Sequence, residues 1–177
     1  MGAETIVIGA GSAGAVIAAR MSERSDREVL LVEAGPDYPT GPLPADLRDG
    51  TRNSIGPHDW GLRHTPMPGQ VPFDFPRGKV VGGSSAVNTC IALRGQAYDY
   101  DEWAERGLPA WSFEHCLPAF KRLERDLDIH DEHHGSSGPI PIRRHTRDEL
   151  VPWQAAFLES ARGLGFPPCA DHNGPAA

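Results

Sequence analysis

The feature that most constrains this chain is a short apolar run that leads straight into a glycine-rich turn near the N-terminus. Residues 5–8 (TIVI) lack polar alternation, which is typical of a parallel strand buried on both faces. Residues 9–14 (GAGSAG) follow at once, and residues 15–21 have the small and apolar side chains of a helix that lies on a sheet. A second apolar run over residues 28–32 ends in Glu33. We therefore predict a strand–helix–strand unit.

The spacing of the glycines indicates what this unit binds. Gly9 allows a tight turn, Gly11 lets the backbone approach a pyrophosphate, and Gly14 lets helix and strand pack closely. The N–H groups of the first helical turn would then face the phosphates. Glu33 stands where a carboxylate accepts hydrogen bonds from ribose hydroxyls and repels a 2′-phosphate. The unit predicts a dinucleotide site that disfavours NADP. By itself it does not separate FAD from NAD, and a purely structural glycine-rich turn is the alternative.

Composition excludes several other classes of protein. The chain has 177 residues, with 17 Lys and Arg against 24 Asp and Glu, and this acidic balance argues against nonspecific nucleic-acid binding. No stretch approaches the roughly 20 apolar residues of a membrane span. The three cysteines form no CxxC pair, so neither a disulfide scaffold nor a zinc knuckle is expected. Because the first strand starts close to the N-terminus, we expect no signal peptide and a cytoplasmic location.

A proline-rich segment, residues 36–76, separates this unit from a second glycine motif. A disordered linker is one interpretation, since a loop of about 40 residues is unusual in a compact domain. We favour an extended excursion pinned to the surface, because the segment carries many apolar side chains: Leu43, Leu47, Ile55, Trp60, Leu62, Phe73 and Phe75.

The second glycine motif lies in residues 77–88 (RGKVVGGSSAVN). Its paired glycines and serines offer backbone N–H and hydroxyl donors to an anionic ligand, although a plain Gly/Ser turn is the alternative. Asn88 would begin a helix or strand over residues 88–93, and its side-chain amide could bond the edge of a heterocycle.

Together these motifs resemble the glucose–methanol–choline (GMC) flavoprotein oxidoreductases. The similar segments occur in the family's order along essentially the whole chain: residues 8–14, 33–35, 59–60, 77–88, 94–95, 98–103, 107, 111–112 and 138–140. The resemblance implies an α/β fold, α+β overall, with a Rossmann-like FAD-binding core. It also implies a long extended excursion and the start of a substrate-binding region.

The resemblance also implies a set of cofactor contacts. Some family members attach FAD through a histidine directly before the asparagine. Here that position is Val87, so we expect noncovalent FAD. The implied cofactor-binding residues are Gly9, Gly11, Ser12, Ala13, Gly14, Glu33, Ala34, Val81, Gly82, Gly83, Asn88, Thr89, Cys90 and Ile91.

The activity implied is oxidation of a small alcohol, with hydride passing from the alcohol carbon to flavin N5. The family's catalytic histidine belongs to its C-terminal part, and none of the eight histidines here sits at a matching motif. We therefore expect the catalytic base beyond residue 177. Residues 1–135 would be FAD-binding, and residues 136–177 the truncated beginning of the substrate-binding region. A catalytically inert FAD-binding fragment and an NAD-dependent dehydrogenase are the alternatives.

Two helices and a strand are predicted in the second half. Pro118 would open a helix with Phe120, Leu123 and Leu127 on one buried stripe. A second helix would run from Pro152 to Gly165. It too would bury an apolar stripe, formed by Trp153, Ala156, Phe157 and Leu164. Residues 139–143 read as a strand at the edge of a sheet.

A histidine-rich segment lies between these elements. His130, His133 and His134 resemble a metal cluster, together with the neighbouring acidic residues Asp128, Asp131 and Glu132. Helical spacing would be needed to bring the histidines together, and the nearby glycines and proline favour a solvated loop instead. No metal site is therefore predicted.

Overall fold

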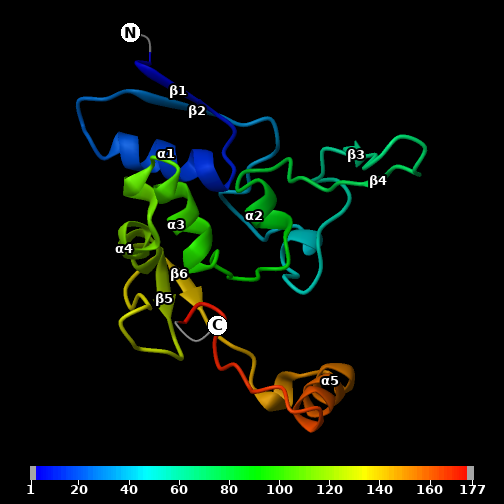
Figure 1. The fold of residues 1–177 in the computed structure, drawn as a ribbon. Helices are drawn as coiled ribbons and strands as arrows, with labels where there is room; N and C mark the ends of the chain where they lie inside the picture. The colour runs from blue at the N-terminus through cyan, green and yellow to red at the C-terminus, as the bar shows by residue number, and fades with distance from the viewer. Residues whose placement is uncertain (1–2, 175–177) are drawn as a thin grey trace. The chain divides into compact units, whose positions relative to one another are not determined.

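The computed structural model describes residues 3–174 as a mixed α/β chain that divides into two compact units (Figure 1). The N-terminal unit ends at Ile91 and the C-terminal unit begins at Ala92. The N-terminal unit contains β1 (Thr5–Ile8), α1 (Ser12–Ser22), β2 (Val29–Val32), the 3₁₀ turn η1 (Ala45–Leu47), β3 (Arg63–His64), β4 (Phe73–Asp74) and α2 (Ser84–Val87). The C-terminal unit contains α3 (Ala97–Glu105), the 3₁₀ turn η2 (Pro109–Trp111), α4 (Phe113–Leu123), β5 (Glu124–Asp126), β6 (Ile140–Ile142), the 3₁₀ turn η3 (Arg147–Glu149) and α5 (Pro152–Gly163).

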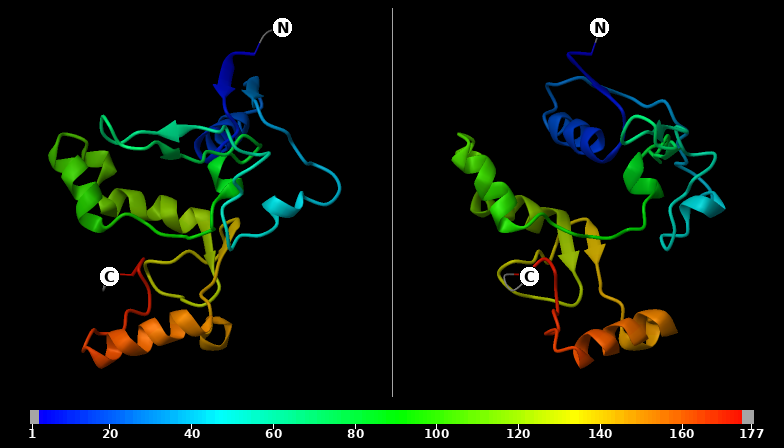
Figure 2. Two further views of the ribbon diagram at one scale, coloured as in Figure 1. Left: turned by 90° about the vertical axis from the view of Figure 1, so that its right-hand side faces the viewer. Right: turned by 45° about the vertical axis from the view of Figure 1, so that its right-hand side comes forward.

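The predicted strand–helix–strand unit is confirmed. β1 and β2 pair in parallel, from Thr5 opposite Val29 to Ile8 opposite Val32, and α1 lies along one face of the pair (Figure 2). The expected burial of both faces is wrong. Side chains alternate across a strand, and Ile6 and Ile8, on the face away from α1, are 60% and 87% exposed. Within residues 3–174 no layer covers that face.

The proline-rich excursion is pinned, but by polar contacts. The Asp46 carboxylate accepts hydrogen bonds from the Ser54 hydroxyl at 2.5 Å and pairs with His58 Nδ1 at 2.6 Å. His58 Nε2 lies 2.7 Å from the Tyr38 hydroxyl, and both Ser54 and His58 are buried. The apolar anchors expected from the sequence are mostly exposed, Ile55 by 60% and Trp60 by 48%, so burial of apolar side chains does not hold the segment.

The segment that begins at Asn88 is neither a helix nor a strand, in contrast to the prediction. α2 ends at Val87, and Asn88 Oδ1 accepts a hydrogen bond from the N–H of Cys90 at 2.9 Å. This local turn puts Cys90 at φ +55°, in the left-handed region, which interrupts any regular element.

In the C-terminal unit, α4 starts earlier than predicted. Ser112 caps it, its hydroxyl accepting a hydrogen bond from the N–H of His115, so Pro118 lies inside the helix and not at its start. Leu127 lies beyond the helix, and no residue of α4 is buried, so the predicted buried stripe is wrong. Phe120 packs instead against Tyr100 of α3, with ring centroids 5.6 Å apart.

The last helix has nearly the predicted bounds. α5 runs over Pro152–Gly163, and Gly165, at φ +86°, follows it in the left-handed conformation of a helix end. Its apolar side chains are not core: Trp153 is 83% exposed and Phe157 69%. β6 confirms the predicted strand and pairs in parallel with β5. None of the helices between residues 3 and 174 is long and apolar enough to span a bilayer.

Candidate cofactor site

The turn after β1 has a backbone that requires glycine at two positions. Gly9 has φ +93°, which L side chains rarely adopt. A Cβ placed on Gly14 would lie 1.9 Å from the carbonyl oxygen of Gly9 and 3.3 Å from Cγ1 of Val7. The tight turn and the close packing of α1 on β1 that the spacing predicted are both present.

The second glycine motif packs directly against this turn. Gly82 donates its N–H to the carbonyl oxygen of Ala10 at 2.8 Å, and Gly11 forms a β-bridge with Gly82. Gly83 is buried at φ +54°, and a Cβ there would lie 2.7 Å from Cα of Gly11. Two motifs far apart in the sequence thus meet backbone to backbone, and a side chain at position 83 would push them apart.

Glu33 ties the turn to the end of β2. Its Oε2 accepts a hydrogen bond from the N–H of Ala10 at 2.7 Å, and its Oε1 accepts one from Gly35 at 2.8 Å. The hydrogen bond from Gly35, with that from Ala10, lowers the pKa of the Glu33 carboxyl below its ordinary value. The side chain is therefore ionised at neutral pH. Sequence reasoning expected a ribose contact here and missed this role in holding the turn.

These elements enclose a cleft of about 590 Å³, a size suited to a small-molecule ligand. The N-terminus of α1 faces it, with no acidic residue in the first helical turn to oppose an anion. A glycine-walled cradle beside a helix N-terminus fits a pyrophosphate group. Eight of the predicted binding residues line the cleft: Gly9, Gly11, Ser12, Ala13, Gly14, Glu33, Ala34 and Gly83.

The other predicted binding residues are not among those that line the cleft. Gly82 supports its wall through the hydrogen bond to Ala10. Val81 donates its N–H to the carbonyl oxygen of Pro36 at 3.0 Å. The segment from Asn88 to Ile91, with Thr89 and Cys90 inside it, follows α2 as irregular chain.

Sequence reasoning missed Trp60 as part of the cleft wall. The indole Nε1 donates a hydrogen bond to the carbonyl oxygen of Gly78 at 3.1 Å, and Lys79 Nζ lies 4.9 Å from the ring centroid. Nearby, the Asp59 carboxylate accepts a hydrogen bond from the N–H of Arg77 at 2.7 Å. The Asp59-Trp60 pair was a signal, because it was among the segments that resemble the family. Gly78 and Ser84, with Ile8 and Val32, complete the lining.

The histidine-rich loop differs from the prediction at one position. His130 is exposed and the segment is a loop, as expected, but His134 is only 5% exposed. The interpretation as a solvated loop is wrong for His134 because carboxylates from β5 and from Asp171 surround its ring.

Comparison with known proteins places the chain in a family. The family model described as GMC oxidoreductase matches residues 3–175. The chain belongs to the GMC oxidoreductase family. It is 36% identical, over 96% of its length, to an oxygen-dependent choline dehydrogenase of Vibrio vulnificus.

Two solved structures share its fold. Pyridoxine 4-oxidase from Mesorbium loti has a TM-score of 0.81 and 32% identity over 94% of this chain. An FAD-dependent oxidoreductase from Chaetomium thermophilum has a TM-score of 0.77 and 28% identity over 96% of it. The chain spans only 30% of the choline dehydrogenase, 33% of the pyridoxine oxidase and 31% of the Chaetomium protein.

Proposed function

We propose that this chain is the FAD-binding N-terminal part of a GMC oxidoreductase that oxidises the CH–OH group of a small alcohol. The observation that carries the proposal is the cleft itself, in which two glycine motifs and an ionised Glu33 surround the N-terminus of α1. The family match over residues 3–175 supports FAD in preference to NAD, as does the likeness to a neighbour described as FAD-dependent.

Each part of the cleft has a proposed role toward FAD. Gly9 to Gly14 would hold the pyrophosphate through backbone N–H groups and the Ser12 hydroxyl, and Glu33 with Ala34 the adenosine ribose. Gly82 and Gly83, with Val81 and the segment Asn88–Ile91, would lie toward the flavin. Val87 stands where a covalent attachment would need histidine, so the binding is noncovalent. When bound, FAD supplies the hydride acceptor of the reaction.

The rest of the reaction belongs to the remainder of the protein in this proposal. No histidine of this chain is assigned as the base, and the base is placed beyond residue 177. Residues 1–135 serve FAD, and residues 136–177 begin the substrate-binding region. The product is an aldehyde or a ketone. A cytoplasmic location, and the absence of a nucleic-acid partner, remain predictions from the sequence.

Cofactor titration of the intact protein with Gly11→Ala tests the proposal. The added Cβ meets only Cα of Gly83, at 3.7 Å, so the fold tolerates it while the methyl group narrows the cleft. We expect FAD affinity to fall about tenfold or more, with the unfolding midpoint changed by less than about 2 °C. Gly56→Ala, where the new Cβ meets nothing within 4 Å, is the matched control. Unchanged FAD affinity in Gly11→Ala would remove this cleft from cofactor binding.

A second measurement separates an enzyme from an inert FAD-binding protein. The intact protein, loaded with FAD under anaerobic conditions, is mixed with small primary alcohols, and the flavin absorbance is followed. Bleaching supports the alcohol oxidoreductase. Stable absorbance with every alcohol supports the inert alternative, and hydride transfer to added NAD by flavin-free protein would support a nicotinamide enzyme.

A further inference from the structure

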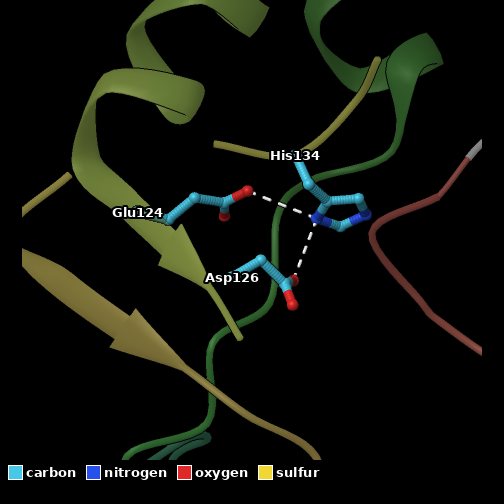
Figure 3. Close-up of side chains that lie close together, drawn as sticks. All are labelled: Glu124, Asp126 and His134. Atoms are coloured by element: carbon cyan, nitrogen blue, oxygen red, sulfur yellow. Dashed lines mark ion pairs between the residues drawn. The ribbon is translucent and has the colours of Figure 1, made fainter. Parts of the chain in front are cut away.

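A buried ionic cluster in the C-terminal unit has no part in the proposed FAD site. Figure 3 shows its centre, where the ring of His134 faces Glu124 and Asp126 of β5. The His134 side chain is 1% exposed, and those of Glu124 and Asp126 are 11% and 0% exposed. Such complete burial of an ionisable ring requires compensation from its neighbours.

Both ring nitrogens of His134 face carboxylate oxygens. Nδ1 lies 3.2 Å from Glu124 Oε1 and 3.1 Å from Asp126 Oδ2, while Nε2 lies 3.1 Å from Asp171 Oδ2. Among the described residues neither nitrogen makes a well-directed hydrogen bond, so these contacts are chiefly electrostatic. A neutral imidazole would point the lone pair of one nitrogen at a carboxylate. A positive charge on this ring would suit the carboxylates on both of its sides.

The charge balance of the cluster leads to the same conclusion. Arg94 binds Glu124 at 2.7 Å, and Arg144 bridges Asp126 at 2.8 Å and Asp171 at 2.7 Å. Two guanidinium groups leave one of the three carboxylates uncompensated, and a charged His134 balances it. Asp131 also faces Nε2, at 3.9 Å, but its side chain is 46% exposed and is screened by water.

Two of these carboxyl groups stay ionised despite their burial. Burial acts to raise the pKa of Asp126, but the N–H groups of Ile129 and Asp128 and the guanidinium of Arg144 outweigh it, so the pKa is lowered. Burial likewise opposes ionisation of Asp171, and the hydrogen bond and charge of Arg144 again lower the pKa. The negative charges that surround the ring therefore persist through the neutral pH range.

A metal ion is the competing occupant, because Glu124, Asp126 and His134 offer three ligand atoms within 4.8 Å of one another. The same carboxylates already bind the guanidinium groups of Arg94 and Arg144. Glu124 Oε1 also accepts a hydrogen bond from the N–H of Gly135 at 2.8 Å. A divalent ion would lie beside two guanidinium groups and leave an excess of positive charge, whereas one proton balances the cluster.

We propose that His134 is a buried imidazolium that joins β5, its own turn and the segment around Asp171 into one cluster, and so positions Arg94. The N–H of Arg94 donates to Asn173 Oδ1 at 2.8 Å, and the N–H of Asn173 donates to Asp171 Oδ2 at 3.0 Å. These contacts tie Arg94 to the cluster through Asn173 and Asp171. His130 and Lys121 line an adjoining cavity of about 450 Å³.

Nitrogen NMR of the intact protein tests the proposal directly. With ¹⁵N-labelled histidine at about pH 7.5, exposed imidazoles are roughly nine-tenths neutral. We expect His134, one of the eight histidines of residues 1–177, to show protons on both ring nitrogens. A neutral tautomer for His134 would overturn the proposal. So would a ring nitrogen whose signal changes with a chelator, together with a stoichiometric metal by elemental analysis.

Variants assign the signal and measure its consequence. His134→Gln should remove that signal and lower the unfolding midpoint by about 4 °C or more near pH 6.5, while His130→Gln, at an exposed position, changes neither. Retention of that signal in His134→Gln, or an unfolding midpoint equal to that of wild type, would contradict the proposal. If His134→Gln does not fold, the wild-type spectrum still decides, with its signal assigned through the backbone.

Discussion

The backbone of residues 9–14 and of Gly82 and Gly83 forms the cradle of the proposed FAD site. This cradle and the ionic cluster around His134 are built from different parts of the chain. In the cradle, backbone meets backbone, and glycine at position 83 removes the side chain that would separate the two loops. In the cluster, charged side chains from distant positions meet in a buried site. The cradle depends on the missing Cβ atoms of glycine, and the cluster depends on the balance between positive and negative side chains. Substitutions should therefore damage them in different ways.

The largest effect is expected where the cradle has no room. In Gly14→Ala the new Cβ would lie 1.9 Å from the backbone oxygen of Gly9, so the turn must move. We expect the free energy of unfolding to fall by about 4 kcal/mol, and FAD binding to be lost. Urea denaturation and FAD titration measure both. If Gly14→Ala were stable and bound FAD normally, the turn would not be rigid. Steric clash would then not distinguish the cradle from the cluster.

The cluster should fail through an uncompensated charge. Arg144→Met leaves Asp126 and Asp171 buried without their guanidinium partner, which should cost about 3 kcal/mol in urea denaturation. The neighbouring Arg143 pairs with Glu149 at the surface and lowers the pKa of that carboxyl to about 2. Arg143→Met is therefore the control, and its unfolding midpoint should stay within about 1 °C of wild type. Equal losses in the two variants would contradict a special role for the buried cluster.

The smallest effect is expected at Glu33, the charged side chain whose carboxylate binds the backbone of the turn after β1. Glu33→Ala should weaken FAD binding by about 1–3 kcal/mol. Glu28→Ala, at an exposed position, is the control and should leave FAD affinity unchanged. The pKa of Glu33 is lowered, so its contribution is complete above the ordinary value of 4.5 and is lost as pH falls through the lower value. Wild-type affinity should therefore stay level from neutral pH down to about pH 5. An affinity that already falls near neutral pH would mean that Glu33 is not the group that titrates.

The same contrast explains what could be predicted from the sequence. The turn after β1 depends on contacts between near neighbours, so the spacing of Gly9, Gly11 and Gly14 was enough to predict it. The resemblance to a family implied only that Gly82 and Gly83 share the cofactor with that turn, and the direct contact between them was not predicted. The cluster joins Arg94, Glu124, His134 and Asp171, and no local pattern indicates which of the surrounding charges will be buried together.

Apolar patterns predicted elements better than burial. The bounds of β1, β2 and α5 agree with the sequence, yet Ile8 and Trp153 are exposed. Periodicity identifies the face of an element that is able to pack, whereas burial requires a second layer. The prediction that Pro118 opens a helix was wrong because Ser112 caps α4 six residues earlier, which puts the proline inside the helix.

The uncovered side of β1 has a practical consequence for handling this polypeptide. The sheet of β1 and β2 has two strands, so within the described chain both are edge strands, and Ile6 and Ile8 present apolar carbon to water. Open edges and apolar patches promote association between chains. A preparation limited to these 177 residues should therefore bind hydrophobic dyes and form soluble aggregates as its concentration rises.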